Sequence, residues 1–504
     1  MGGICLKPTF ISHALYQYSV LQRLREHYSD GIFVIVNSDW PLVVKFWMTD
    51  LSQITTLLQD FYDPKGPMPR DPASMLRSFL LFLMVCPEVG ITKWIDALHR
   101  VPYYAIISGF EPGDIPGVGT FYDFFKRLWD ASDKNLKPKK QKKRKRKVKK
   151  GKKGEKAPTT TPGKLKRLVK WVMRHPFVKT ELPSDRLFHF FQTQILETSA
   201  KLGLLGNIDA LSVAGDGTPI VTSAYIRSKA TCDCRAHGIT DCNHSRLYSQ
   251  PDCNSGWDSS REKYFNGYHL YMLSAADSPY DLPLYPRLQP ASRHDAISLV
   301  ISSHEFHQRF TLGTVDKMLL DAAHDAEAIY VLLDHQNAEA FIDLNKRGKK
   351  NTTTESDIRI SPKGIPICSC NLEMKPNGKD NTQCRQKWRC PKANRKEISC
   401  STPCSDAAYG RTFHTSHKDN LRLFPKTLRD SEKWKMIYKR RTSIERSNKR
   451  EKLDYKLESG RHRSTMMWYV RIYGIMICQH LDAWYSHQEK AFTNFKSFVF
   501  PQVG

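Results

Sequence analysis

The sequence predicts an α/β domain that follows an all-helical N-terminal domain and a basic, low-complexity linker. Three observations lead to this fold class. The apolar pattern from Trp40 to Trp129 is helical, with Pro72 at a helix start and Met75–Val85 apolar on nearly every side. Residues 135–163 are mostly Lys, Arg, Thr, Pro and Gly, a composition that cannot form a core. Beyond the linker, β-rich runs alternate with helical segments.

The charge of the chain points to a polyanionic partner. It has 78 Lys and Arg against 51 Asp and Glu, a formal net charge of +27. Residues 137–156 hold fourteen of these cations and one Glu, which is +13, so the remainder still carries +14. Such a field favours nucleic acid, with salt-sensitive binding. An anionic membrane is the competing partner, but the longest apolar run, Phe79–Cys86, is far shorter than the ~20 residues of a membrane span. We therefore expect a soluble, cytoplasmic protein that binds no membrane.

Length and spacing divide the chain into three parts: a helical domain at 1–134, the linker at 135–163, and the α/β domain at 164–504. The helical domain either contacts nucleic acid or serves a structural or dimerising purpose. Between Asp321 and Glu445 lie 123 residues, too many for one crossover connection. We therefore expect an inserted, Cys-rich subdomain at about 346–430.

Two aspartates are predicted at the ends of strands. Asp216 lies in the β-rich run LSVAGDGTPIVTSA, where the apolar residues stop and a Gly-Thr-Pro turn is expected. Ile220–Ala224 and Tyr268–Ala276 are predicted as two further strands of a meander. Asp321 closes the short apolar run that begins at Lys317, and a helix follows. Strand, aspartate and helix in this order place a carboxylate at the carboxyl edge of a sheet, where open α/β folds carry their chemistry.

Each aspartate has an alternative interpretation. An isolated Asp-Gly pair such as that at Asp216 is often a hairpin turn. Asp325 competes with Asp321, although we expect it to be a partner of the helix N-terminus. His294 and Asp295 are expected to form an ordinary N-cap, with a supporting role beside the carboxylates as the alternative.

The segment YKRRTSIERSNKREK, residues 438–452, supplies a third carboxylate. It lacks Pro and Gly and is rich in helix formers, so we expect one helix. At roughly 100° per residue, Tyr438, Arg441, Glu445 and Lys452 would fall within an arc of about 60°. The alternative is an ordinary solvated, charged helix.

The spacing Y-x2-R-x3-E-x6-K, preceded by two aspartates, resembles that of DDE transposases of bacterial insertion sequences. The segments PRDPASMLRSFLL and VGTFYDFFKRL also look like the N-terminal helical domain of that class. The resemblance implies an RNase H-like catalytic core with a triad of Asp216, Asp321 and Glu445. It also implies DNA contacts by Tyr438, Arg441, Lys449 and Lys452.

The activity that this resemblance implies is DNA transposition: strand cleavage at the ends of an element, then strand transfer into double-stranded target DNA. Three carboxylates would hold two Mg²⁺ (or Mn²⁺) ions, which prefer oxygen ligands and catalyse in-line phosphoryl transfer. A homodimer or larger synaptic complex, associated with the bacterial nucleoid, is expected. Two rival functions are a catalytically silent DNA-binding protein derived from such an enzyme and an RNase H-like nuclease.

Two groups of cysteines suggest structural zinc, with scattered reduced thiols as the alternative. The first group is Cys232, Cys234, Cys242 and His244. The second is Cys384, Cys390, Cys400 and Cys404, within the expected insertion. Separately, the run SGWDSSREKYF holds Trp257, Tyr264 and Phe265. We expect these rings to pack on a strand face or in the core, with stacking on an unpaired base as the alternative.

Deleting residues 137–156 should weaken DNA binding and flatten its salt dependence, because phosphate contacts release counterions and carry no base information. The measurement is the dissociation constant over a series of salt concentrations for several DNA sequences. A deletion that changed which sequence is bound best would contradict this prediction.

Overall fold

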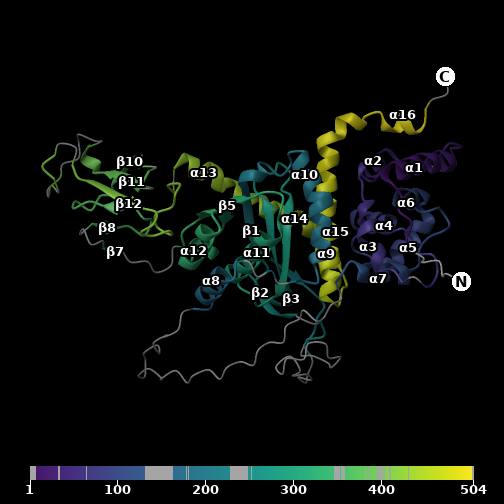
Figure 1. Ribbon diagram of the computed structural model, residues 1–504, viewed down its shortest axis with the longest axis horizontal. Coiled ribbons are helices and arrows are strands. Elements are labelled where there is room, and N and C mark those ends of the chain that lie inside the picture. Colours follow the sequence, from purple (N-terminus) through teal and green to yellow (C-terminus); the bar gives the residue numbers. More distant parts are fainter. Residues whose placement is uncertain are drawn as a thin grey trace.

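The computed structural model (Figure 1) describes residues 7–31, 34–63, 65–130, 163–176, 179, 181–226, 248–250, 253–345, 352–353, 358–380, 382–383, 385–393, 400, 403, 405–407, 410–429 and 431–501. A mixed sheet lies at the centre of the molecule, with the strand order β2-β3-β1-β5-β6 and with β4 also paired to β3. The strands are β1 Leu211–Val221, β2 Asn254–Asp258, β3 Lys263–Ala275, β4 Pro283–Pro290, β5 Val315–Leu320 and β6 Glu339–Ile342.

Pairing in this sheet is antiparallel on one side of β1 and parallel on the other. β3 runs antiparallel to β1, β2 and β4, whereas β5 runs parallel to β1 and β6. This mixed α/β architecture is consistent with an RNase H-like DDE domain. It corrects the expected meander in one respect. Ile220–Ala224 is no separate strand, since β1 continues through Pro219 to Val221 with no turn after Asp216. β5 pairs with β1 only as far as Ala214, and proline is tolerated along an unpaired strand edge.

Helices cover both faces of the sheet. Because β3 side chains alternate between the faces, their contacts show which helices cover each face. Even-numbered residues face α14 (Thr442–Leu453) and α15 (Thr465–Gln488): the Ser274 and Ser443 hydroxyls lie 3.4 Å apart, and the Tyr268 ring contacts Trp468. Odd-numbered residues face α11 (Asp295–Arg309), where His269 lies beside Asp295. The remaining helices of this region are α8 Lys164–Arg174, α9 Asp185–Phe190, α10 Glu197–Lys201, α12 Glu327–His335 and α13 Glu432–Tyr438. The C-terminal helix α16 Phe495–Val499 lies against the N-terminal helices, where Arg25 donates to Val499 O.

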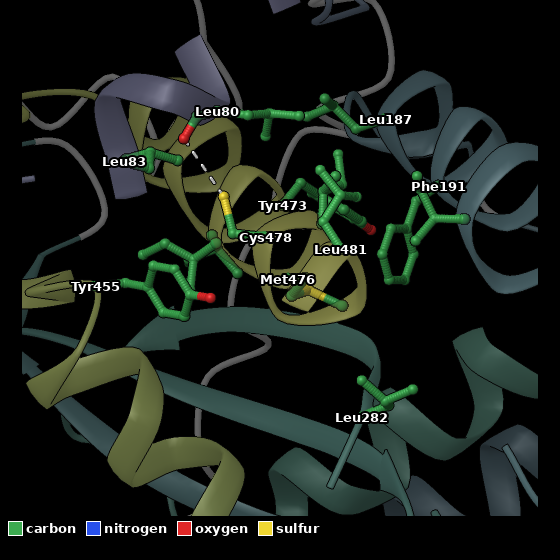
Figure 2. Packing of buried hydrophobic residues seen from close by; sticks show 14 of the residues in the cluster. Leu80, Leu83, Leu187, Phe191, Leu282, Tyr455, Tyr473, Met476, Cys478 and Leu481 are labelled. Carbon is green, nitrogen blue, oxygen red and sulfur yellow. Dashed lines mark hydrogen bonds between the residues drawn. The ribbon is translucent and has the colours of Figure 1, made fainter. Parts of the chain in front are cut away.

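The N-terminal region is helical, as predicted, and shares one continuous hydrophobic core with the sheet. Helix α15, expected from the apolar run Thr465–Trp484, stands between the two (Figure 1). Figure 2 shows its residues Met476, Cys478 and Leu481 among side chains of the N-terminal helices and of the α/β region. A Cβ at Gly474 would lie 2.6 Å from Leu83, so this position admits no larger residue without a shift. The N-terminal helices are α1 His13–Tyr28, α2 Trp40–Met48, α3 Gln53–Leu58, α4 Pro72–Val85, α5 Ile91–Arg100, α6 Pro102–Ser108 and α7 Val118–Arg127.

Between β6 and α13 the structure contains two small three-stranded sheets. Their strands are β7 Thr352–Thr353, β8 Arg359–Ile360, β9 Pro366–Ile367, β10 Lys375–Asp380, β11 Arg385–Arg389 and β12 Thr412–Ser416. A separate small core of Cys368, Met374 and Trp388 lies here. None of the helices in the described ranges is long and apolar enough to cross a membrane.

Helix α14 buries a carboxyl group against the core. Glu451 is 1% exposed, on the same helix face as Ile444, Ser447 and Asn448. Burial raises the pKa of Glu451 to about 8, from an ordinary value of 4.5. The folded chain therefore holds this proton at neutral pH, whereas the unfolded chain releases it.

Glu451→Gln should stabilise the protein at alkaline pH. Between pH 4.5 and 8 the folded state binds more protons at this site than the unfolded state, so the stability of the wild type falls as pH rises. Glutamine keeps the shape and cannot ionise. Urea unfolding should show a gain on the order of a few kcal/mol at pH 9, shrinking towards pH 4.5. The exposed Glu432→Gln is the control; an equal gap at both pH values for Glu451→Gln would contradict the assignment.

Candidate active site

Asp216 lies in the middle of the central strand, level with the end of β5. The parallel register aligns Ala214 with Leu319, so Asp216 and Asp321, two residues further along each chain, reach the same edge of the sheet. One Asp216 oxygen accepts a hydrogen bond from its neighbour Gly217 N at 2.8 Å. Burial, added to by the charges of Asp321 and Asp295, raises the pKa of Asp216 to about 6. The carboxylate is therefore placed where a cation would stabilise its charged form.

Asp321 caps a short 3₁₀ turn, Ala322–His324, directly after β5. Its Oδ1 accepts from Ala323 N at 3.1 Å and lies 2.5 Å from His324 Nδ1. Burial alone would raise the pKa of Asp321, but the hydrogen bond and charge of His324 hold it below the ordinary value. Ala323 N and His324 both contact Oδ1 and so fix the orientation of the Asp321 carboxylate.

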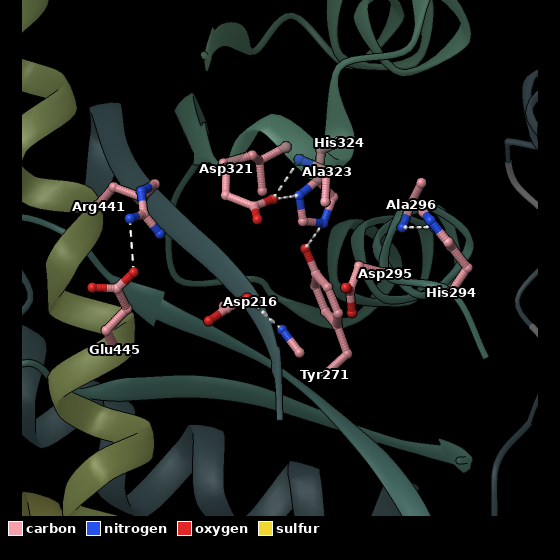
Figure 3. A network of polar contacts seen from close by, with 12 residues as sticks. Asp216, Tyr271, His294, Asp295, Ala296, Asp321, Ala323, His324, Arg441 and Glu445 are labelled. Carbon is pink, nitrogen blue, oxygen red and sulfur yellow. Dashed lines mark hydrogen bonds and ion pairs between the residues drawn. The ribbon is translucent and has the colours of Figure 1, made fainter. Parts of the chain in front are cut away.

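His324 in turn is held by a residue of β3. It is fully buried, and its Nε2 lies 2.9 Å from the hydroxyl of Tyr271 on β3. Figure 3 shows the His324 ring in contact with Asp321 through one nitrogen and with the Tyr271 hydroxyl through the other. Gly215 makes room for this contact, because a Cβ there would lie 2.9 Å from the Tyr271 hydroxyl. Sequence reasoning missed Tyr271; its only signal was an odd position in a strand opposite the small residues around Asp216.

Glu445 approaches from the other side of β1, on the first turn of α14. Its Oε1 accepts from Arg441 Nη2 at 2.7 Å, and its side chain is 49% exposed. In Figure 3 the Arg441–Glu445 pair lies across β1 from Tyr271, with Asp216 between them. The structure thus places Asp216, Asp321 and Glu445 on three neighbouring elements around the end of β5. Within the described ranges, however, no three His, Cys, Asp or Glu side chains lie close enough together to hold a metal ion.

Each of the three carboxylates has a donor within the protein: Gly217 N for Asp216, His324 for Asp321 and Arg441 for Glu445. The donor set of three carboxylates nevertheless fits Mg²⁺, which takes oxygen ligands.

The expected single helix from Tyr438 to Lys452 is wrong in one detail. α13 ends at Tyr438, a 3₁₀ turn spans Lys439–Arg441, and α14 begins at Thr442. Tyr438, Arg441 and Glu445 nevertheless remain neighbours, since the Arg441 guanidinium lies 5.9 Å from the Tyr438 ring centroid and contacts Glu445. The Tyr438 hydroxyl donates to Leu320 O at 3.2 Å, and its ring stacks on Trp434. Tyr438 therefore fastens this segment to the end of β5, beside Asp321.

The two lysines of this segment differ in their surroundings. Lys449 is exposed. The Lys452 side chain is 20% exposed, and its Nζ lies 3.8 Å from Glu458. Burial lowers the pKa of Lys452.

Asp325 lies outside the site, before the start of α12 at Glu327. The expected role as a partner of the helix N-terminus is wrong, because Asp325 forms a buried bidentate ion pair with Arg422 at 2.7 and 2.8 Å. Arg422 follows β12, so this pair fastens the region of small sheets to the turn that carries Asp321. His294 is the N-cap that we predicted: its Nδ1 accepts from Ala296 N.

Of the eight residues predicted to bind zinc, only Cys390 and Cys400 lie in the part of the chain that the structure describes. Cys232, Cys234, Cys242, His244, Cys384 and Cys404 lie outside the described residues. Cys390 is a buried free thiol. The expectation that Cys400 is a zinc ligand is not supported, since it forms a disulfide with Cys370, 30 residues earlier. A bonded sulfur offers no thiolate to a metal.

Residues 234–479 match the family model described as "Transposase DDE domain". The chain carries a transposase DDE domain. No curated protein matches it. The transposase match includes Asp321 and Glu445 but begins after Asp216. The structure adds Asp216, because β1 pairs with β3 and β5, which both lie within the matched span.

Asp325→Asn should destabilise the protein by about 3–5 kcal/mol, because it leaves the Arg422 guanidinium unpaired in a buried site. Denaturant unfolding would measure the loss. The matched control is Asp334→Asn: this carboxylate is 44% exposed, lies 3.4 Å from Lys426, and should cost under about 1 kcal/mol. Equal, small losses for both variants would show that the Asp325–Arg422 pair does not support the fold.

Proposed function

We propose that this transposase cleaves DNA strands at the ends of its element and joins the freed 3′-hydroxyl to target DNA. The observation that supports the proposal is the position of three carboxylates on neighbouring elements around the end of β5. Asp216 comes from the central strand, Asp321 from the end of its parallel neighbour, and Glu445 from the helix across β1 (Figure 3).

The three carboxylates are the residues that would hold Mg²⁺ or Mn²⁺. Two such ions activate an attacking water or 3′-hydroxyl and stabilise the leaving oxygen. The protein's own part is to present charged oxygens in a defined direction. Because His324 and Ala323 N engage Asp321 Oδ1, the remaining oxygen Oδ2 is the one presented to a cation. Asp216, with its pKa raised to about 6, is largely deprotonated near neutral pH.

Arg441 has two tasks in this proposal. In the absence of DNA it neutralises Glu445 through the 2.7 Å contact. When DNA enters, the guanidinium transfers to a phosphate oxygen, with which it forms strong, often bidentate hydrogen bonds. Glu445 is then released to serve as a cation ligand. Lys449, exposed one helical turn beyond Glu445, adds a second phosphate contact, and Lys452 a third.

The partners follow from the chemistry and charge. The net charge of +27 suits double-stranded DNA, both element ends and target. Joining two ends requires that they be held together, so we propose a homodimer or larger assembly, located with the bacterial nucleoid.

Asp216→Asn, Asp321→Asn and Glu445→Gln should each reduce Mg²⁺-dependent strand cleavage by several orders of magnitude and leave DNA affinity largely unchanged. Each change removes one charged ligand while keeping the side-chain shape. Cleavage is measured on end-labelled DNA that carries the element's terminal sequence, and affinity on the same DNA without Mg²⁺.

The control for this series is Asp454→Asn, which removes an exposed carboxylate just beyond the end of α14. It should cleave as the wild type does. A triad variant that retained wild-type cleavage would remove that residue from the site. A wild-type protein that binds DNA and never cleaves it would support the silent DNA-binding alternative.

A further inference from the structure

The hairpin formed by β2 and β3 presents an aromatic pair to solvent. Trp257 and Tyr264 are opposite each other in the antiparallel register, and their ring centroids lie 4.9 Å apart in an edge-on arrangement. Trp257 is 54% exposed and Tyr264 78%. These two rings pack against each other on the strand face, which is one of the two placements that we expected, and Phe265 is buried. Two large, adjacent, exposed rings are typical of a binding surface.

The pair lies on the same face of the sheet as the catalytic carboxylates. Asp216 is opposite Met272 in the register with β3, and Tyr264 is an even number of residues from Met272 along the same strand. Alternate side chains of a strand share a face. This face is also the one that α14 covers, as the Ser274–Ser443 contact shows.

A short chain of contacts connects the end of α14 to the hairpin. Lys452 Nζ lies 3.8 Å from Glu458, and Glu458 forms a 2.7 Å ion pair with Arg261 in the turn between β2 and β3. Glu458 also accepts a hydrogen bond from Val221 N at the end of β1. The aromatic pair thus comes next along the surface after Glu445, Lys449 and Lys452. From Asp216 it is eight residues along the strand direction, or about 26 Å.

The charge around the aromatic pair indicates which kind of partner binds there. Exposed cations flank this route in the hairpin and in the segment after α14: Lys263, Lys456, Arg461 and Arg463. A second copy of a chain with a net charge of +27 would be repelled here, whereas a polyanion would be attracted. Aromatic rings add affinity for nucleic acid when a base exposes its flat face, that is, when it is unpaired.

We propose that Trp257 and Tyr264 form a stacking site for an unpaired base of the DNA strand that passes the active site. The site lies about eight nucleotides from the scissile phosphate, at ~3.4 Å of rise per nucleotide. This inference deepens the proposed function and rests on it. It implies that the protein holds the DNA end partly opened, with one strand along α14 and a base on the hairpin.

The test compares two fluorescent DNA probes of the same sequence, a blunt duplex and a duplex with a single-stranded arm. Trp257→Ala should weaken binding of the armed probe roughly tenfold and leave binding of the blunt duplex unchanged. Trp257→Phe should retain most of the affinity. The control is Trp171→Ala, which removes a comparably exposed (46%) indole from α8.

A second measurement determines which nucleotide of the strand stacks on the aromatic pair. The fluorescent base 2-aminopurine is placed at successive positions of the armed strand, with cleavage blocked by omitting Mg²⁺. Its emission should be quenched most about eight nucleotides from the cleavage point, and Trp257→Ala should abolish that quenching.

Three outcomes would overturn the inference. Equal loss on both probes would mean a general phosphate contact, and no loss would mean that the rings do not bind DNA. A change in sedimentation of the DNA-free protein on Trp257→Ala would identify a second copy as the occupant. Failure of the proposed function is distinguishable, because wild-type protein would then bind neither probe or would never cleave.

Discussion

The pairing of β1 on both of its edges is the constraint on which the rest of the structure depends. Its parallel register with β5 brings Asp216 level with Asp321, which is 105 residues later in the chain. Its antiparallel register with β3 pairs Tyr271 with Gly217 and His269 with Pro219. Because the two strands come from distant parts of the sequence, the site exists only when the sheet has formed.

The two faces of this sheet carry different parts of the candidate site. On one face, Tyr271 and His324 hold Asp321 through hydrogen bonds, and His269 forms a separate pair with Asp295. The glycines at 215 and 217 permit these contacts, since a Cβ at either position would collide with these side chains. On the other face, α14 brings Glu445 and Arg441 towards Asp216 and continues to the exposed aromatic hairpin. A change in the register of β1 would therefore disturb both faces at once.

Two further elements are fastened to this centre by buried arginines. Arg471 of α15 donates to the carbonyl oxygens of Pro87 at 2.8 Å and Lys456 at 2.7 Å, which joins the N-terminal helices to the segment after α14. Arg422 clamps Asp325, four residues after Asp321. Because a buried charge that loses its partner is costly, both contacts stabilise the attachment of these elements to the turn and helix that carry the candidate catalytic residues.

The sequence by itself determined the kinds of element and identified three candidate carboxylates. Apolar periodicity predicted the N-terminal helices and α15. Two aspartates in β-rich runs, with the Y-x2-R-x3-E-x6-K spacing, predicted the three candidate carboxylates, although Asp216 lies within β1 and not at its end. These signals are local, so they can be read from neighbouring residues. The uninterrupted β1, the 3₁₀ turn before α14, the partner of Asp325 and the exposure of Trp257 and Tyr264 were decided only by the tertiary structure. Each depends on which distant segment lies alongside, and no local pattern records that.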